Sequence, residues 1–247
     1  MPVAPADLDH LAHPVVAAFL TRQREHAEVI ERGDAVAVRT TLKLAPIAGL
    51  WARRLEDGLA ALGELLARYP AALLISYDET EQAALAARFG AAPIFSPLQQ
   101  MVFEGRPAGD WPSGPVEELG AGDYPAMQEL VDLAQPGPFG EESLRIGRFI
   151  GVRDGAPLVA MGGLRTQSDR VAELTAISTR PEARGRGLAA RIVATLVDGL
   201  LAEGRTPYLH VAETNATAIR VYDRLGFRTR RRARLMLIQP SSSGGRA

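Results

Sequence analysis

The chain has 247 residues, 47% hydrophobic content and a formal net charge of −1, enough apolar material for one large core or two smaller ones. A net charge so close to zero gives no general attraction to nucleic acid, and the absence of cysteine excludes a disulfide framework, a thiolate metal site and a cysteine nucleophile. The N-terminus carries Asp7 and Asp9 instead of a basic start, and no apolar run approaches the roughly 20 residues of a membrane span. We therefore expect a soluble, cytoplasmic protein of bacterial type.

The first part of the chain predicts an α/β domain over residues 1–103. Residues 70–77 form an extended apolar run, a helix follows and ends at Phe89 and Gly90, and a further extended run covers residues 96–104. Residues 103–115 are dense in proline and glycine and are typical of a linker, which we place at 104–115.

The second part, residues 116–239, predicts a mixed sheet flanked by helices. Asp154 and Gly155 form a good hairpin turn, while Asp123 and Pro125 suit a helix N-terminus as cap and first-turn residue. Strands are expected at 116–119, 147–152, 158–165, 171–179, 208–212 and 234–239, and helices at 124–133, 188–201 and 216–225. The serine- and glycine-rich tail 240–247 is expected to be disordered.

A glycine-rich turn connects the strand at 171–179 to the helix at 188–201. Gly185 and Gly187 allow a diphosphate to approach the backbone, and amides at Leu188 and Ala189 would point toward it. Arg184 and Arg186 add positive charge. The turn predicts a phosphate site; the alternative is simply a tight strand-to-helix connection.

A second motif lies in the helix that starts near residue 216. Asn215, Ala218 and Tyr222 are spaced i, i+3 and i+7, which places them on one stripe of the helix, and Gly226 is placed to end it before Phe227. The alternative for the tyrosine is a half-buried ring that packs on the sheet.

Together these motifs resemble those of the GNAT superfamily of N-acetyltransferases, over about residues 115–239. The first signature, Arg/Gln-x-x-Gly-x-Gly/Ala, is matched by Arg184, Gly187 and Ala189. The second is matched by Asn215, Ala218, Tyr222, Gly226 and Phe227. Residues 206–211, Thr-Pro-Tyr-Leu-His-Val, are also similar to the subgroup related to glycine N-acyltransferases. The resemblance implies a mostly antiparallel GNAT sheet and acetyl-CoA as co-substrate.

The first part repeats the end of the second in weakened form. If Gly90 is aligned with Gly226, Glu79, Gln82 and Ala86 take the places of Asn215, Ala218 and Tyr222. No Arg-x-x-Gly-x-Gly turn occurs before Trp51. We therefore expect a degenerate GNAT-like half at about residues 15–103, which packs against the active half and helps to shape the acceptor pocket.

The resemblance implies that acyl-CoA enters where the strand at 171–179 separates from the strand at 208–212. Its pantetheine arm would contact the backbone at Ile177, Ser178 and Thr179, and an amide near Ile177 would hold the oxyanion. Asn215 would orient the pantetheine or the adjacent backbone. Tyr222 is the expected proton donor to the leaving thiolate.

The nearest candidate for the base that removes a proton from the acceptor ammonium is Glu173, which we expect to act directly or through water with a pKa raised by partial burial. The alternative is a solvated or salt-bridged strand carboxylate. His210 is the reserve base, although a lone strand histidine is more often structural.

Three functions stay open: transfer of acetyl to a small amine or amino acid, acetylation of a protein lysine or N-terminus, and non-catalytic sensing of acyl-CoA. The small residues Ala160, Gly162 and Gly163 leave open a longer acyl group. The residues do not indicate an oligomeric state.

Two other residue groups have weaker interpretations. The basic run at residues 228–234 is read as edge protection or as a contact to the adenosine phosphate of CoA, not as a nucleic-acid site. His10, His13 and His26 lack metal-ligand spacing, and no metal is expected.

Overall fold

The computed structural model describes residues 8–43 and 45–239, and these divide into two compact units. Unit 1 comprises residues 8–42, 46–98 and 232–239, and unit 2 comprises residues 43, 45 and 99–231. The boundaries therefore differ from the expected division near residue 103. The expected disordered tail at 240–247 lies outside the described residues.

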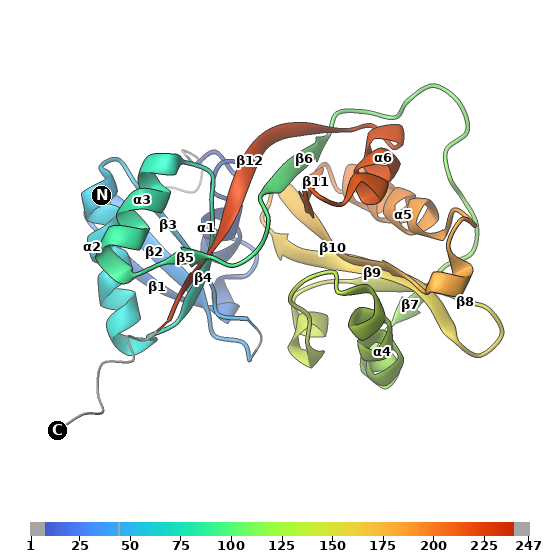
Figure 1. The fold of residues 1–247 in the computed structure, drawn as a ribbon, viewed down its shortest axis with the longest axis horizontal. Coiled ribbons are helices and arrows are strands. Elements are labelled where there is room, and N and C mark those ends of the chain that lie inside the picture. The colour runs from blue at the N-terminus through green and yellow to red at the C-terminus, as the bar shows by residue number, and fades with distance from the viewer. Residues whose placement is uncertain (1–7, 44, 240–247) are drawn as a thin grey trace. The chain divides into compact units, whose positions relative to one another are not determined.

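Unit 1 is an α/β unit (Figure 1). Its strands β1, β2 and β3 form an antiparallel meander, β4 adds parallel to β3, and the second half of β12 pairs antiparallel with β4 and with β5. Its elements are α1 (Pro14–Leu20), β1 (Ala27–Arg32), β2 (Ala35–Thr40), β3 (Ile47–Ala52), α2 (Leu55–Arg68), β4 (Ala72–Ser76), α3 (Glu79–Phe89) and the short β5 (Ala92–Pro93).

Unit 2 has the same order of helices and strands. Strands β7, β8, β9 and β10 are antiparallel neighbours, and β11 adds parallel to β10. Its elements are β6 (Leu98–Phe103), β7 (Glu117–Leu119), α4 (Tyr124–Ala134), β8 (Phe149–Arg153), β9 (Leu158–Gln167), β10 (Val171–Thr179), α5 (Leu188–Ala202), β11 (Thr206–Ala212), α6 (Ala216–Arg224) and β12 (Phe227–Ile238).

The two units are structural repeats. The series α1–β1–β2–β3–α2–β4–α3 in unit 1 corresponds to α4–β8–β9–β10–α5–β11–α6 in unit 2, and in both the two central strands are parallel. The strands after the last helices are exchanged, because β6 neighbours β11 in unit 2 whereas β12 pairs with β4 in unit 1. The expected fold class, a mixed, mostly antiparallel GNAT-like sheet preceded by a degenerate half, is confirmed.

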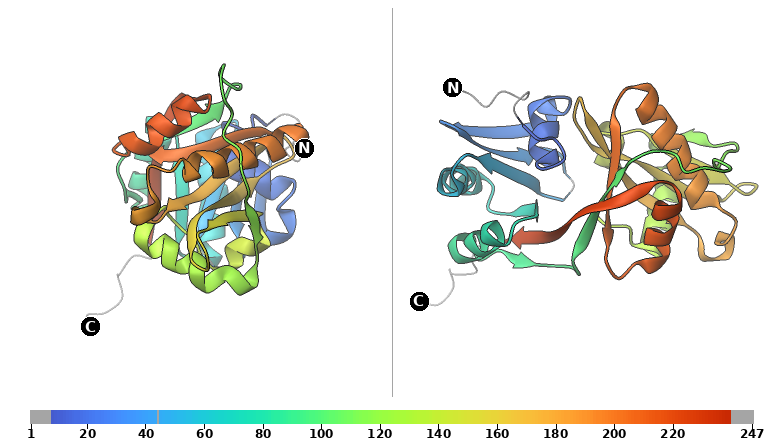
Figure 2. Two further views of the ribbon diagram at one scale, coloured as in Figure 1. Left: turned by 90° about the vertical axis from the view of Figure 1, so that its right-hand side faces the viewer. Right: turned by 90° about the horizontal axis from the view of Figure 1, so that it is seen from above.

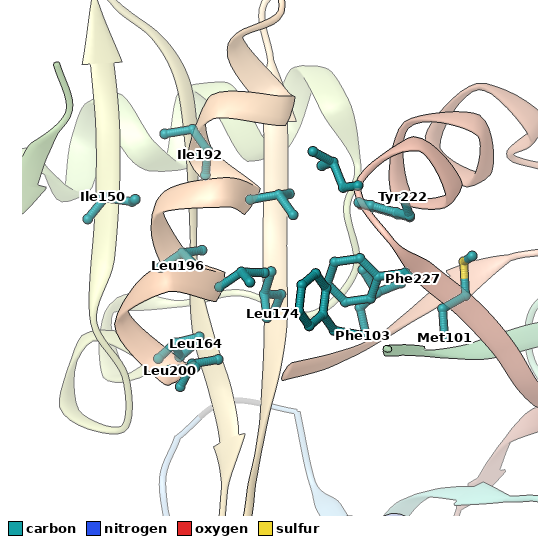
Figure 3. Close-up of a cluster of buried hydrophobic side chains, with 14 of the residues drawn as sticks. Met101, Phe103, Ile150, Leu164, Leu174, Ile192, Leu196, Leu200, Tyr222 and Phe227 are labelled. Atoms are coloured by element: carbon teal, nitrogen blue, oxygen red, sulfur yellow. The ribbon is translucent and has the colours of Figure 1, made fainter. Parts of the chain in front are cut away.

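Helices cover both faces of the unit 2 sheet. Viewed with unit 2 toward the reader, α5 and α6 lie on one face and α4 on the other (Figure 2). Leu174, Ile192, Tyr222 and Phe227 share the core on the α5 face (Figure 3), and Leu209 belongs to the same core. A smaller cluster on the α4 face includes Met127, Phe149 and Ala176. Leu174 and Ala176 of β10 thus face two separate environments.

The expected linker is irregular and is attached to α5. The indole Nε1 of Trp111 donates to Asp198 Oδ1 at 3.1 Å, and Arg106 Nη2 lies 2.5 Å from the same oxygen. Ring packing of Trp111 against Phe103 adds an apolar contact. These residues hold the segment along the helix within unit 2.

Two local expectations are corrected. Asp123 does not cap α4 with its side chain; it accepts from Gly120 N in a preceding 3-10 turn and pairs with Arg153. The last strand begins at Phe227, not at Arg234, so it includes the basic run. Arg234 is paired with Ser76 of β4, so that part of the strand is no exposed edge in need of charge protection.

No helix among the described residues is long and apolar enough to cross a membrane. In the same residues, no group of three or more His, Cys, Asp or Glu side chains is placed to hold a metal ion.

Candidate active site

The glycine turn between β10 and α5 has the backbone geometry that only glycine adopts readily. Gly185 has φ 79° and Gly187 has φ 72°, both in the left-handed region. A β-carbon built on either glycine would meet nothing within 4 Å, so the space beside the turn is open. Arg186 pairs with Asp154 at 2.6 Å, and this contact partly offsets its charge.

The N-terminus of α5 begins at this turn without a side-chain cap. Gly187 occupies the N-cap position and offers no side chain to the first amides of the helix. Leu188 and Ala189, which open the helix, therefore contribute unfilled N–H donors and the positive end of the helix dipole. Open space, uncapped amides and a positive dipole suit a diphosphate.

Strand β10, which leads into this turn, separates from β11 part of the way along its length and so forms a fork. Their parallel ladder runs from Val171 and Thr206 to Leu174 and Leu209, and ends there. Beyond it, β10 bulges against β9, and Ala176 has φ 54°, a left-handed conformation rare for a residue with a side chain. The bulge turns β10 out of register just where its pairing with β11 stops.

The strand segment after the bulge holds unused polar groups. Ser178 is buried, and neither its Oγ nor Thr179 Oγ1 has a hydrogen-bond partner. Since Ile177 to Thr179 also lie beyond the ladder, their backbone edge is not paired with β11. Buried donors and acceptors without partners are uncommon in native proteins and point to a bound group.

Helix α6 places the second motif. Asn215 caps the helix, since its side-chain oxygen accepts from Ala218 N at 3.0 Å. The asparagine is exposed and belongs to the cap instead of a side stripe. Gly226, with φ 89°, follows the helix end as expected. Of the three predicted stripe residues, only Ala218 and Tyr222 face inward.

Tyr222 is buried in the α5-face core beside Phe227, with the ring centroids 6.0 Å apart. Burial raises the pKa of its phenol to about 12. Within the described residues, the hydroxyl has no hydrogen-bond partner. The ring thus packs as the alternative interpretation expected, while its phenol stays protonated at neutral pH.

Glu173 does not have the raised pKa that its burial suggested. Desolvation does raise it, but ion pairing with Arg165 and a hydrogen bond from His210 outweigh this and hold the pKa of the carboxyl well below its usual range. Arg165 Nη2 lies 3.0 Å and His210 Nδ1 2.9 Å from Glu173 Oε1. Glu173 is therefore a buried, charge-paired carboxylate and a weak base.

The candidate acid and the Glu173 cluster lie on opposite faces of the sheet. Leu209 and Val211 of β11 belong to the α5-face core with Tyr222. His210 stands between them in sequence and so projects to the other face, where it meets Glu173. The structure thus brings Glu173 and His210 together and separates both from Tyr222 by the thickness of the sheet at the fork.

Gly162 and Gly163 of β9 leave no unfilled space beside their backbone. A β-carbon at Gly162 would lie 2.4 Å from Ile177 Cδ1 and 2.7 Å from Ile192 Cγ2, and one at Gly163 would lie 2.4 Å from the Phe149 ring. Neighbouring side chains already fill both spaces.

Sequence reasoning missed Arg165. Between the pairs Ala172–Gln167 and Leu174–Leu164, Glu173 opposes two residues of β9, Arg165 and Thr166. This bulge places the guanidinium against the carboxylate. The residues next to Arg165 in sequence do not indicate this contact. The available signal is that an arginine and a glutamate lie on facing strands of a predicted hairpin.

Within its described residues, unit 1 lacks the glycine turn and a counterpart of Tyr222 but keeps a capped helix. Only Arg53 and Arg54 separate β3 from α2, so no glycine turn is present there. Asp78 caps α3 through Glu81 N as Asn215 caps α6, which shifts the expected alignment by one residue at this end. The counterpart of Tyr222 counted from the cap is the buried Leu85.

Known proteins resemble this chain over part or all of its length. The family model "FR47-like protein" matches residues 149–236. A solved structure from Novosphingobium aromaticivorans DSM 12444, described as an acetyltransferase from the GNAT family, is 31% identical; the match covers 97% of this chain and 100% of that one, with a TM-score of 0.75. No curated protein matches the sequence significantly.

Two further structures are similar in fold at lower identity. A GCN5-related N-acetyltransferase from Kribbella flavida is 18% identical, with 93% of this chain and 96% of that one covered and a TM-score of 0.60. A tandem GNAT protein from the clavulanic acid biosynthesis pathway is 17% identical, with 99% of each chain covered and a TM-score of 0.54. The chain therefore belongs to the GNAT family, whose fold uses acyl-CoA.

Proposed function

We propose that the protein is an N-acetyltransferase that moves an acetyl group from acetyl-CoA to a primary amine of a small molecule or amino acid by direct attack. The observation that supports this most is the β10–β11 fork, which opens at the bulge beside an uncapped, glycine-lined helix N-terminus. We also assign the chain to the subgroup similar to glycine N-acyltransferases, on residues 206–211.

In this proposal the turn from Arg184 to Ala189 binds the diphosphate of CoA. The pantetheine arm follows β10 and bonds the backbone of Ile177, Ser178 and Thr179, beyond the ladder. A backbone amide near Ile177 stabilises the oxyanion, because its dipole is already fixed before the reaction. Asn215 acts indirectly, by capping α6 and holding the start of the helix beside the fork.

Tyr222 supplies the proton for the leaving thiolate. With a pKa of about 12, the phenol is a weaker acid than a thiol of ordinary pKa, about 8.5, so complete transfer is uphill by roughly 5 kcal/mol. The transfer becomes feasible when the amine nitrogen of the tetrahedral intermediate returns a proton to the tyrosine as the C–S bond breaks. Tyr222 is then a relay between nitrogen and sulfur.

A small acceptor is favoured by the cover over the Glu173 face within unit 2. Arg165 Nη1 donates to Pro138 O at 3.5 Å, and Phe139 packs against the α4-face cluster that includes Met161 of β9. These contacts attach the segment after α4 to β9. The face is thus covered by a loop, an arrangement more suited to a compact amine than to an extended peptide.

The test is release of CoA thiol from acetyl-CoA against a panel of amino acids, polyamines, aminoglycosides and lysine peptides. Turnover with a small amine class supports the proposal and identifies that class. Turnover with the peptides alone would make the protein a protein acetyltransferase. Calorimetric binding of acetyl-CoA without turnover on any acceptor would instead indicate a sensor.

A further inference from the structure

Three charged or ionisable side chains from three neighbouring strands meet on the sheet face opposite Tyr222. Arg165 comes from β9, Glu173 from β10 and His210 from β11. Arg165 uses two nitrogens, Nη2 at 3.0 Å from Oε1 and Nε at 3.3 Å from Oε2 of the carboxylate. His210 Nδ1 lies 2.9 Å from Oε1. The histidine and glutamate side chains are only 6% and 3% exposed.

This arrangement selects one form of the imidazole. An ionised carboxylate can only accept hydrogen bonds, so the nitrogen that faces Glu173 must carry the proton. In the neutral ring the lone pair then lies on Nε2, which is the atom that can accept a proton from a substrate. Arg165 keeps Glu173 ionised, because its guanidinium offsets the cost of burying the negative charge.

The position of His210 along its strand matters as much as its partners. The last paired residues of the parallel ladder are Leu174 and Leu209. His210 is therefore the first residue of β11 beyond the ladder, at the opening of the fork. The face that it occupies is the one covered by the segment after α4, where the acceptor is expected.

We propose that His210 is the general base for the acceptor amine and that Glu173 and Arg165 are positioning residues that act through it. This inference rests on the proposed function. The ammonium gives one proton to Nε2, and the neutral amine then forms the C–N bond at the thioester carbonyl. The C–S bond breaks as the second nitrogen proton passes through Tyr222 to sulfur, and His210 releases its proton to solvent. Each acetyl transferred thus releases one proton.

Groups beside His210 include Glu173 of β10, Arg165 of β9 through that carboxylate, and Tyr208 of its own strand, whose ring centroid lies 5.7 Å from that of His210. Of these, Glu173 and Arg165 are charged at neutral pH. Since a general base must be unprotonated to act, the acidic limb of the kcat/KM profile should be lost in His210→Gln.

The experiment compares His210→Gln and Glu173→Gln with a matched control, His26→Gln. His26 also lies beside a glutamate, with Nε2 3.6 Å from Glu25, but it belongs to unit 1. We expect His210→Gln to lower kcat by about 10²- to 10³-fold and to remove the acidic limb, with acetyl-CoA binding unchanged. Combining Glu173→Gln with His210→Gln should lower kcat no further, because both act through one group.

A second readout does not depend on turnover. Nitrogen-15 NMR of the histidine rings should show the His210 proton on Nδ1 in the wild type, and a mixture of tautomers in Glu173→Gln. Because that substitution leaves Arg165 buried without its counter-ion, the double variant Arg165→Met/Glu173→Gln is measured beside it. A wild-type proton on Nε2, or an unchanged rate in folded His210→Gln, would overturn the inference. Absence of turnover in the wild type would contradict only the proposed function.

Discussion

Gly187 and Gly204 provide a matched pair for testing the phosphate turn. Both flank α5, with φ 72° and 70°, and a β-carbon on either would meet nothing within 4 Å. An alanine at either position adopts the left-handed conformation at a cost of about 1–2 kcal/mol. We therefore expect Gly187→Ala and Gly204→Ala to lower the free energy of unfolding by similar amounts in urea denaturation.

Binding of acetyl-CoA should separate the two variants. Gly187 precedes the uncapped amides, whereas Gly204 lies past the other end of the helix. The 15 residues of α5 at 1.5 Å per residue give a helix about 22 Å long between them. The new methyl group at 187 projects into the open space beside the turn. Loss of one charge-assisted hydrogen bond, worth about 1.5–3 kcal/mol, weakens binding by about 10- to 100-fold.

Isothermal titration calorimetry with acetyl-CoA measures this directly. The expected result is weaker binding by Gly187→Ala and wild-type binding by Gly204→Ala. Equal affinities in two folded variants would refute the assignment of the diphosphate to this turn, and equal losses in both would attribute the effect to helix strain.

Two further substitutions test the sheet and the helix cap. Arg165→Met should lower the free energy of unfolding by about 3–5 kcal/mol at pH 7, because it leaves the buried Glu173 carboxylate without its positively charged partner. In the wild type the pKa of Glu173 is lowered, so its contribution is complete above the unfolded pKa of about 4.3 and is lost as pH falls through the folded pKa. Without Arg165 the folded pKa rises, and the deficit should shrink between pH 7 and pH 5; a deficit independent of pH would argue against an ion-pair origin. Asn215→Ala should cost about 0.5–2 kcal/mol while Asn215→Asp retains the cap, and a large loss of acetyl-CoA affinity in the alanine variant alone would show that the amide contacts the ligand.

Local chemistry made the centre of unit 2 predictable. The strand at 171–179 matches β10 at both ends, because Pro181 and the glycine turn interrupt any continuation of the strand. The N-cap at Asn215 and the left-handed Gly226 were predictable for the same reason, because each depends only on residues close to it in sequence.

The misses depend on contacts between distant residues. The last strand was expected only from Arg234, with the basic run read as edge protection, yet β12 is one continuous strand from Phe227 whose end pairs with β4. The low pKa of Glu173 needed Arg165, which only the bulge in β9 brings into contact. Burial alone predicted a raised pKa for Glu173, whereas the ion pair lowers it.

The central claim is that unit 2 transfers acetyl from acetyl-CoA to an amine with Tyr222 as the proton relay. The most direct measurement is the rate of acetylated amine formation, followed by mass spectrometry, in the wild type, Tyr222→Phe and Tyr124→Phe. The last variant also removes a hydroxyl from unit 2, one that donates to Gln128 on α4. We predict product from the wild type and Tyr124→Phe, and a roughly 10²-fold slower rate in Tyr222→Phe with acetyl-CoA binding nearly intact. Equal rates in all three proteins would contradict the relay, and no acetylated amine from the wild type with any acceptor class would contradict the claim as a whole.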